Sequence, residues 1–529
     1  MNNSYDVIVV GGGHNGLVSA CYLAEEGKKV LVLEAADKIG GMSASGYLIP
    51  EAPEHMIHSC ALDLMSLRVH PMVPEELQLT RHGFKQVEIK PGYVYCHPNG
   101  DTLVFGRSPE ATANEIARFS SKDASEFIEL MKLVNVFLDM AIPMMRADPA
   151  QFNFSAKIKA LTALLKNIKL KSHVMDLIQS PAYTSIMERF EHPVTQSALC
   201  SLLGAAGPIA NEGTGVFFAL LGFIHRFGIG RAVGGIQTFP NALEARLKEL
   251  NGEIKISSEV TEIVAEQGQI SGVALEDGTH LTAKVVIAAI HPKTAFDLVT
   301  PGAFDRKVMT RVALAPANAH GAAPMKIDIA LNSQISYAKL EAKRGDGLCL
   351  RSAVILVGTA DAVLDNFKCA AAGTVSNKPY FWATAPTAAD PSQAPTGEDV
   401  VYIYPIAMPV EPSDGWDAIR ADTAQQIIDF TAVYMEGLKD YEIARRVEAS
   451  PDLAERLKVY RGCVVHIDTG ITRSGMMRPA AGLGGNKLPV DGFFLGGAGI
   501  HPGGGVNGLP GRITAARVKR FFKKNLFFF

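Results

Sequence analysis

Residues 6–17 read Asp6-Val7-Ile8-Val9-Val10-Gly11-Gly12-Gly13-His14-Asn15-Gly16-Leu17, and this segment sets the architecture of the chain. A β-branched run stops at glycines with the spacing G-x-G-x-x-G, and an apolar pattern of helical period follows. Gly11 permits a tight turn, Gly13 lets the backbone approach phosphate groups closely, and Gly16 lets the helix pack on the strand. The helix N-terminus offers free N–H groups and a positive dipole end to an anion. The segment therefore predicts a strand, turn and helix that bind a pyrophosphate.

A second strand and an acidic residue strengthen this prediction, because the glycine spacing alone occurs by chance in Gly-rich chains. The strand Lys29-Val30-Leu31-Val32-Leu33 ends in Glu34, whose carboxylate can accept hydrogen bonds from both hydroxyls of an adenosine ribose. After Ala35, the pair Gly40-Gly41 precedes Met42 and lets a loop lie against the ribose and phosphates from the far side. An ordinary glycine turn is the alternative for that pair. We expect a dinucleotide-binding unit here.

Length and composition limit the class of protein. At 529 residues the chain has room for two to four units of ~150 residues. Lys and Arg number 51 against 54 Asp and Glu, a net charge of −3 that gives no reason to expect a nucleic-acid partner. The mean hydropathy of +0.12 fits an apolar substrate channel or membrane contact, and equally a large core.

The cysteines and histidines indicate neither a disulfide framework nor a metal site. The seven cysteines have no C-x-x-C spacing, so we interpret them as buried free thiols. The histidines between residues 55 and 97 lack metal-ligand spacing, and we expect no metal. The first strand begins a few residues after Met1, which leaves no room for a signal peptide. The expected location is cytoplasmic, with membrane association left open.

The pattern turns helical from Pro109 to about Phe190 and predicts an inserted helical cap. Its lysines are candidates for contact with anionic lipid headgroups, although a solvated helix face is the favoured interpretation; they are Lys157, Lys159, Lys166, Lys169 and Lys171. Residues 195–225 carry one formal charge, but glycines and a proline interrupt them too often for a membrane-spanning helix. We expect buried helices there, either beside a substrate cavity or in plain core.

The nucleotide-binding pattern resumes after the cap. A Gly-rich turn at 233–239 leads into a helix over 240–250, and a small meander follows from Glu253–Ile256, Val260–Val264 and Ile270–Gly278, with its hairpin turn at Asp277-Gly278. The strand Ala283–Ala289 is expected to re-enter the parallel sheet. This interruption is typical of a flavoprotein with two dinucleotide-binding units. Residues 301–454 predict a second layered domain, with an exposed Pro-rich loop at Pro386–Gly397.

A second glycine-rich stretch closes the chain. Residues 492–511 take a strand into Gly496-Gly497-Ala498-Gly499-Ile500-His501-Pro502-Gly503-Gly504-Gly505-Val506, and a helix is expected over 513–522. Backbone N–H groups at such a turn can hold the second phosphate and ribitol of a flavin and stabilise negative charge on its ring. The tail, Lys519–Phe529, alternates bases and aromatics, which suits an interfacial membrane anchor or a helix docked on a partner subunit of a homo-oligomer.

These motifs resemble FAD-dependent oxidoreductases of the phytoene desaturase type, and most closely the branch that holds desaturase-type carotene ketolases and pyridine nucleotide-disulphide oxidoreductase domain-containing protein 2. The resemblance covers most of the chain and rests on Val9–Gly16 with Glu34 and Gly40-Gly41, Glu76–Gly83, Gly234-Gly235, Asp277-Gly278, His291–Lys293 and Gly497–Val506. It implies an FAD cofactor and a long, apolar small-molecule substrate. It implies FAD contacts from Gly11, Gly13, His14, Asn15, Gly16, Glu34, Ala35, Gly40, Gly41, Met42, Val260, Gly499, Gly504, Gly505 and Val506. Related amine oxidases carry Arg where Met42 stands, which weakens an amine oxidase interpretation.

The expected fold is α/β, a two-dinucleotide-binding-domain flavoprotein with a Rossmann-like FAD domain, an α+β substrate domain and a helical cap. Residues 1–75, 226–300 and 460–529 are predicted to form the FAD domain, and 76–225 with 301–459 the substrate domain, with the cap at about 110–225. The predicted reaction moves a hydride between a carbon of an apolar substrate and flavin N5, acting on a CH–CH bond. The alternatives are an oxidase of C–N or C–O bonds and a non-catalytic flavin-bound interaction protein.

The sequence shows no catalytic triad or carboxylate pair. This fits hydride transfer, which depends on positioning and on the exclusion of water. His501 lies in the C-terminal glycine stretch and is the candidate catalytic residue, either polarising the flavin or receiving a proton; shaping the loop is the alternative. His225, Tyr380 and Trp382 are candidates for the cavity lining or for core packing.

Overall fold

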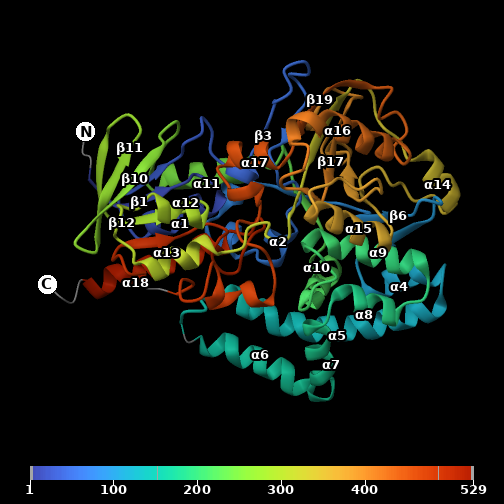
Figure 1. The fold of residues 1–529 in the computed structure, drawn as a ribbon, viewed down its shortest axis with the longest axis horizontal. Coiled ribbons are helices and arrows are strands. Elements are labelled where there is room, and N and C mark those ends of the chain that lie inside the picture. Colours follow the sequence, from blue (N-terminus) through green and yellow to red (C-terminus); the bar gives the residue numbers. More distant parts are fainter. Residues whose placement is uncertain (1–3, 152, 486–487, 526–529) are drawn as a thin grey trace.

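The computed structural model describes residues 4–151, 153–485 and 488–525. Two layered units, each built on a seven-stranded sheet, lie side by side, and a group of helices covers the lower side of the second unit (Figure 1). Strands of the first sheet come from residues 4–33, 253–288 and 493–495, and strands of the second from 93–105, 326–405 and 442–448. The FAD unit and the substrate unit predicted from the sequence correspond to these sheets in outline, while their exact bounds stay a prediction.

The first sheet has a parallel centre. Its order is β10 (Val260–Glu266), β11 (Gln269–Leu275), β12 (His280–Ala288), β1 (Ser4–Val10), β2 (Val30–Leu33) and β9 (Glu253–Lys255), with β20 (Phe493–Leu495) also paired to β12. Val10 pairs in register with Leu33 on one side and with Ala288 on the other, so the carboxyl ends of three strands meet at one edge. The buried residues of β1 face two cores, as expected for a strand covered on both faces.

Helices cover both faces of this sheet. On one face, α1 (His14–Glu25) packs between α11 (Thr238–Glu249) and α18 (Leu509–Asn525). The core on the other face includes residues of α12 (Pro292–Asp297) and α13 (Arg306–Ala313). The N-terminal and C-terminal segments of the chain thereby share one core.

One part of the predicted meander is wrong. β10, β11 and β12 form it alone, whereas β9 lies at the far edge of the sheet and pairs parallel with β2, Ile254 opposite Val32. The strand follows helix α11, and a strand reached through a helical crossover pairs in parallel with the sheet that it re-enters.

The second sheet is mixed and carries the cap. Its order is β19 (Glu442–Glu448), β14 (Lys326–Leu331), β17 (Asp399–Pro405), β16 (Phe381–Thr384), β15 (Val354–Val357), β6 (Tyr93–Cys96) and β7 (Thr102–Phe105). One core contains residues of α14 (Ala338–Arg344) and α16 (Trp416–Ala432). A second core joins the sheet to α15 (Ala360–Ala371) and to most of the cap, which consists of α4 (Pro109–Ala117), α5 (Ser121–Arg146), α6 (Phe154–Lys166), α7 (Lys171–Gln179), α8 (Ala182–Arg189), α9 (Pro193–Leu203) and α10 (Ala219–Phe227).

The loop Pro386–Gly397, predicted to be exposed, is only partly so: Pro391, Ser392, Thr396 and Gly397 are exposed, while Pro386, Thr387, Asp390 and Gln393 are buried. Asp390 accepts a hydrogen bond of 2.6 Å from the Gly234 N–H, and the Gln393 carbonyl accepts one of 2.8 Å from the Met56 N–H. His58 Nε2 lies 2.9 Å from Gln393 Oε1. The prediction is therefore wrong for Asp390 and Gln393, whose polar groups bond to buried partners on the first unit instead of water.

The C-terminal segment packs on its own chain as far as it is described. The Phe521 ring meets Phe494 edge-on at 5.8 Å, and Lys28 Nζ lies 4.4 Å from the Phe522 ring centre. The last aromatics, Phe527–Phe529, fall outside the described residues. Within the described ranges, no helix has the length and apolar run to cross a bilayer. Five of the cysteines are buried as predicted, but Cys349 is exposed and Cys369 is half-buried.

Candidate flavin site

The N-terminal glycine turn leaves an open approach to the start of α1. Gly11 has a φ of +102°, and a Cβ on Gly16 would lie 2.1 Å from the Gly11 carbonyl oxygen. A Cβ on Gly13 would meet no atom within 4 Å. No side chain caps the N-terminus of α1, so its first N–H groups point toward this open space. The turn can accept a phosphate at Gly13, whereas Gly11 and Gly16 are required by the chain itself.

Glu34 lies at the carboxyl end of β2, beside the turn. Its carboxylate accepts hydrogen bonds from the N–H groups of Gly12, at 2.7 Å, and Ala36, at 2.9 Å. The Ser258 N–H donates to the Glu34 carbonyl at 2.9 Å, which brings the segment before the buried Val260 alongside. The predicted ribose acceptor, its neighbour Ala35 and the predicted adenine contact therefore share one edge.

The glycine pair lies against the first turn. The Gly40 N–H donates to the Gly12 carbonyl at 3.0 Å, and the φ angles of Gly40 and Gly41 are +118° and +55°. Met42 follows, and its carbonyl accepts a 2.9 Å hydrogen bond from Ala61. Side chains larger than hydrogen are strained at both glycines, so the pair holds a loop close to the phosphate position.

The C-terminal glycine loop lies beside the N-terminal turn and is the third segment of the candidate flavin site. A Cβ on Gly499 would lie 2.1 Å from Pro292, and one on Gly504 would lie 3.0 Å from Val465. Burial lowers the pKa of His14 to about 4, and a hydrogen bond with the backbone of Gly505 partly offsets this shift. Because His14 is the first residue of α1, this contact brings the C-terminal loop against the start of the helix. Val506 packs into the core that α1 shares with α18.

These three segments fit FAD. They bring all the predicted contacts to one edge of the first sheet, although the binding role of each residue stays a prediction. Asn15 Oδ1 is buried there without a hydrogen-bond partner among the described residues, as expected for an atom that awaits a ligand. The free N–H groups of α1 would hold the pyrophosphate, and Glu34 the ribose.

His501 bridges three segments. Its Nδ1 accepts a 3.2 Å hydrogen bond from the Gly475 N–H, and its Nε2 lies 3.1 Å from the Met144 carbonyl at the end of α5, to which it donates. Burial lowers the pKa of His501 and favours the neutral ring. Since both ring nitrogens are engaged, this geometry favours the alternative in which His501 shapes the loop.

Arg478 supplies a buried positive charge behind the C-terminal loop, and no sequence motif indicated it. It donates to the carbonyls of Ala498, at 2.9 Å, and Val465, at 2.8 Å, and its acceptors in the described part of the chain are backbone carbonyls. Burial lowers the pKa of Arg478 to about 10, so the side chain stays charged at neutral pH. This charge can stabilise an anion that develops beside the loop.

A cluster of polar residues lies where the two units meet; we call Cys60, Lys326, Asp328, Tyr402 and Tyr404 the junction cluster. Lys326 and Asp328 form a buried ion pair, and Tyr402 donates a 2.8 Å hydrogen bond to the Cys60 carbonyl. The rings of Tyr402 and Tyr404 stack with centres 5.9 Å apart. Burial lowers the pKa of Lys326 to about 7.

Backbone hydrogen bonds connect this cluster to the cofactor loops. The Ser59 N–H donates to the Ala44 carbonyl at 2.7 Å, and the Ala61 N–H to Met42, so Cys60 lies directly behind the loop of the glycine pair. A buried group with a strongly shifted pKa at such a place is a candidate for proton transfer. Sequence reasoning missed it, although a charged residue in the apolar strand Lys326–Leu331 and two aromatics at alternate positions of β17 were available signals.

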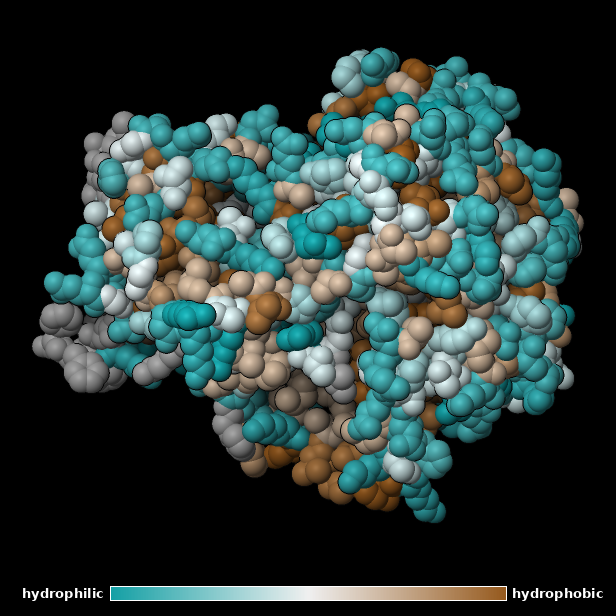
Figure 2. Space-filling model, viewed as in Figure 1, coloured by the Kyte–Doolittle hydropathy of each residue, from teal (hydrophilic) through white to brown (hydrophobic). Residues whose placement is uncertain are grey.

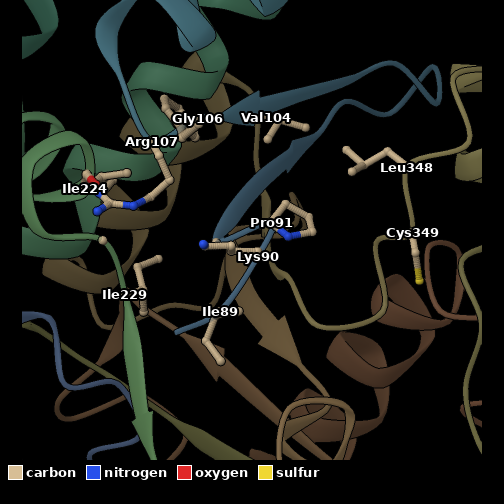
Figure 3. A pocket seen from close by; sticks show the side chains of 13 residues that line it. Ile89, Lys90, Pro91, Val104, Gly106, Arg107, Ile224, Ile229, Leu348 and Cys349 are labelled. Carbon is tan, nitrogen blue, oxygen red and sulfur yellow. Dashed lines mark hydrogen bonds between the residues drawn. The ribbon is translucent and has the colours of Figure 1, made fainter. Parts of the chain in front are cut away.

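The other candidates belong to the core. His225 Nε2 lies 3.1 Å from Thr112 Oγ1 and Tyr380 is buried, whereas Trp382 packs on Tyr93 with ring centres 5.1 Å apart. A cavity of about 400 Å³ opens elsewhere, and Figure 3 shows Arg107 turned toward the Ile224 backbone at its wall. None of the predicted flavin contacts lines that cavity. In the described parts of the chain, no three His, Cys, Asp or Glu side chains gather as metal ligands would.

The chain is similar to known flavoproteins over most of its length. The profile of the family described as flavin containing amine oxidoreductase matches residues 16–407. Pyridine nucleotide-disulfide oxidoreductase domain-containing protein 2 of Mus musculus is 26% identical and aligns over 98% of this chain and 94% of its own length. The lycopene-forming phytoene desaturase of Pseudescherichia vulneris is 22% identical over 96% of this chain and 97% of its own. Cyclohexylamine oxidase from Brevibacterium oxydans has the same fold, with a TM-score of 0.59, 16% identity and coverage of 98% and 99%.

Proposed function

The chain belongs to the flavin containing amine oxidoreductase family and is an FAD-dependent oxidoreductase, and on this premise we propose that it desaturates a CH–CH bond of a long, apolar organic molecule. The observation that carries the proposal is the junction cluster, a buried amine and two stacked tyrosines next to Cys60, which lies behind the loop of the glycine pair. The likeness to a phytoene desaturase over nearly the whole chain supports an apolar substrate. When bound, FAD supplies the hydride acceptor.

The residues of the chain supply the rest of the chemistry. Desaturation takes a hydride from one carbon and a proton from its neighbour, so a group beside the substrate has to accept the proton. A neutral Lys326 amine can do so, because burial brings its pKa to about 7 and leaves part of it unprotonated at neutral pH. Arg478 and the N–H groups of the C-terminal loop stabilise negative charge, and the buried walls exclude water.

Three further proposals follow from the sequence. The chain divides into an FAD unit and a substrate unit at the bounds given above, and it assembles as a homo-oligomer. Its last aromatic residues contact a membrane peripherally. The two sheets support the division into units. The alternation of bases and aromatics at the C-terminus supports both the contact with a partner subunit and the contact with a membrane.

The test is product analysis. The FAD-loaded protein is incubated with a panel of polyenes, alcohols and amines, with oxygen or a quinone as the electron acceptor, and the products are measured by mass spectrometry. We expect a polyene to lose two hydrogens and gain a double bond. Conversion of an amine to an imine or of an alcohol to a carbonyl, with no change in the polyenes, would contradict the proposal.

A further inference from the structure

Helix α6 presents an apolar stripe to the outside of the molecule. Its large side chains recur at the helical spacing of one face and are strongly exposed: Phe154 66%, Ile158 43%, Leu161 54%, Leu165 58%, and, in the turn that follows, Ile168 55%. Ala156 is the one residue of this helix that is fully buried. The side chains of the stripe are therefore not part of the core of the cap.

The lysines and the lack of carboxylates give the segment that carries the stripe charges of one sign. No Asp or Glu occurs between Asp148 and Asp176, while five lysines do, at 157, 159, 166, 169 and 171. At about 100° per residue, Lys157 and Lys159 fall on opposite sides of the stripe. An apolar face flanked by cations is complementary to a surface that is apolar inside and anionic outside.

The position of the stripe allows a flat surface to reach it. α6 packs against α5 on its inner side and forms the lower edge of the molecule, where Figure 2 shows apolar side chains gathered (Figures 1 and 2). Single exposed apolar residues occur elsewhere, for example Leu314 and Val433, but among the described residues only this segment has five that follow one helical face. Contiguous patches of this kind mark interaction sites.

We propose that the α6 stripe, Phe154, Ile158, Leu161, Leu165 and Ile168, docks this protein on the surface of an anionic lipid bilayer, with the flanking lysines on the headgroups. A second copy of the chain is a poorer occupant, because a two-fold contact through this face would bring the two sets of lysines together. The end of α5, where the Met144 carbonyl contacts His501, leads along the chain into α6.

Vesicle flotation of the full-length FAD-loaded protein tests the proposal. The vesicles contain phosphatidylcholine alone or with about 30% phosphatidylserine, which supplies the anionic charge. We expect the protein to float with the anionic vesicles and to be released by added salt, because salt screens the lysine contacts. The variant Leu161→Ser/Leu165→Ser should bind at least about tenfold more weakly. Lys159→Glu/Lys166→Glu should lose a similar factor on anionic vesicles.

Matched controls distinguish binding by the stripe from nonspecific binding by other exposed apolar residues and from binding by the C-terminal tail. Leu314→Ser/Val433→Ser removes apolar residues that are 76% and 63% exposed on other elements, and it should float as well as the wild type. A chain ending at residue 525 should keep most of its binding, because the stripe makes the main contact with the bilayer and the tail a secondary one. The proposal is overturned if the wild type does not float, if the stripe variants float unchanged, or if removal of the tail abolishes binding. It is equally overturned if the stripe variants convert a dimer to a monomer without lipid, since the stripe would then be a subunit interface.

Discussion

The N-terminal glycine turn, the Gly40-Gly41 loop and the C-terminal glycine loop together form what we call the glycine cradle. The cradle and the junction cluster lie next to each other but are built in different ways. The cradle holds its ligand with the backbone, so its residues are defined by what they lack: Gly16 has no room for a Cβ, and Gly13 has open space in front of it. The junction cluster brings together side chains of β14 and β17 and the backbone of Cys60, and its proposed chemistry depends on burial. On this proposal one site combines a cofactor half fixed by local geometry with a chemical half fixed by tertiary packing.

The largest effect is expected within the cradle itself, from two matched substitutions. Gly16→Ala places a methyl group 2.1 Å from the Gly11 carbonyl oxygen, so we expect the loss of soluble folded protein or a destabilisation of about 3 kcal/mol. Gly13→Ala meets no atom within 4 Å, so the apoprotein should unfold at the wild-type temperature while FAD affinity falls about a hundredfold. Calorimetry of the apoproteins and FAD titration measure both.

The opposite result for the two variants would contradict the roles assigned to these glycines. If Gly13→Ala destabilised the apoprotein and Gly16→Ala affected FAD affinity alone, the two glycines would have exchanged roles, and the open space in front of Gly13 would not be the phosphate site.

The next effect concerns the chemical half of the site. Lys326→Met/Asp328→Asn removes the proton acceptor without leaving a buried charge unpaired, so FAD content should stay normal while substrate reduces the flavin ~10²-fold or more slowly. In the wild type, this rate should rise as the pH passes upward through about 7, because only the unprotonated Lys326 amine accepts a proton. Stopped-flow absorbance at several pH values measures both effects.

Asp328→Asn alone is the matched control, because it retains the amine. It should keep a pH-dependent rate, with the rise shifted to lower pH, since loss of the carboxylate removes a charge that favours protonated Lys326. A double variant that still reduces its flavin at the wild-type rate, with the same pH profile, would exclude Lys326 from the reaction.

The smallest effect is expected at His501. Both of its ring nitrogens are engaged with Gly475 and Met144, so we expect His501→Gln to change the rate of flavin reduction by less than about tenfold, well under the loss expected for a general base. Loss of these buried hydrogen bonds should lower the free energy of unfolding by about 1–3 kcal/mol. Loss of the pH dependence in this variant would instead make His501 the proton carrier.

Local patterns predicted the backbone geometry of the cradle, because the glycine spacing and Glu34 encode that geometry within one strand, turn and helix; the binding role of each residue stays a prediction. FAD and the family were also predicted from the sequence. The junction cluster was not, because the sequence does not show that β14 and β17 bring Lys326 and Tyr402 behind Cys60. For the same reason β9 was assigned to the meander, although it pairs with β2, and the burial of Asp390 in the Pro386–Gly397 loop was not foreseen.

Anaerobic bleaching of the bound flavin tests the central claim most directly. The FAD-loaded protein is mixed without oxygen with apolar alkenes, alcohols and amines, and separately with NADH and NADPH, while the absorbance of the oxidised flavin is followed. We expect an apolar polyene alone to bleach the flavin. Bleaching by a nicotinamide and by no organic substrate would contradict it and make the protein a reductase, with the organic molecule as electron acceptor.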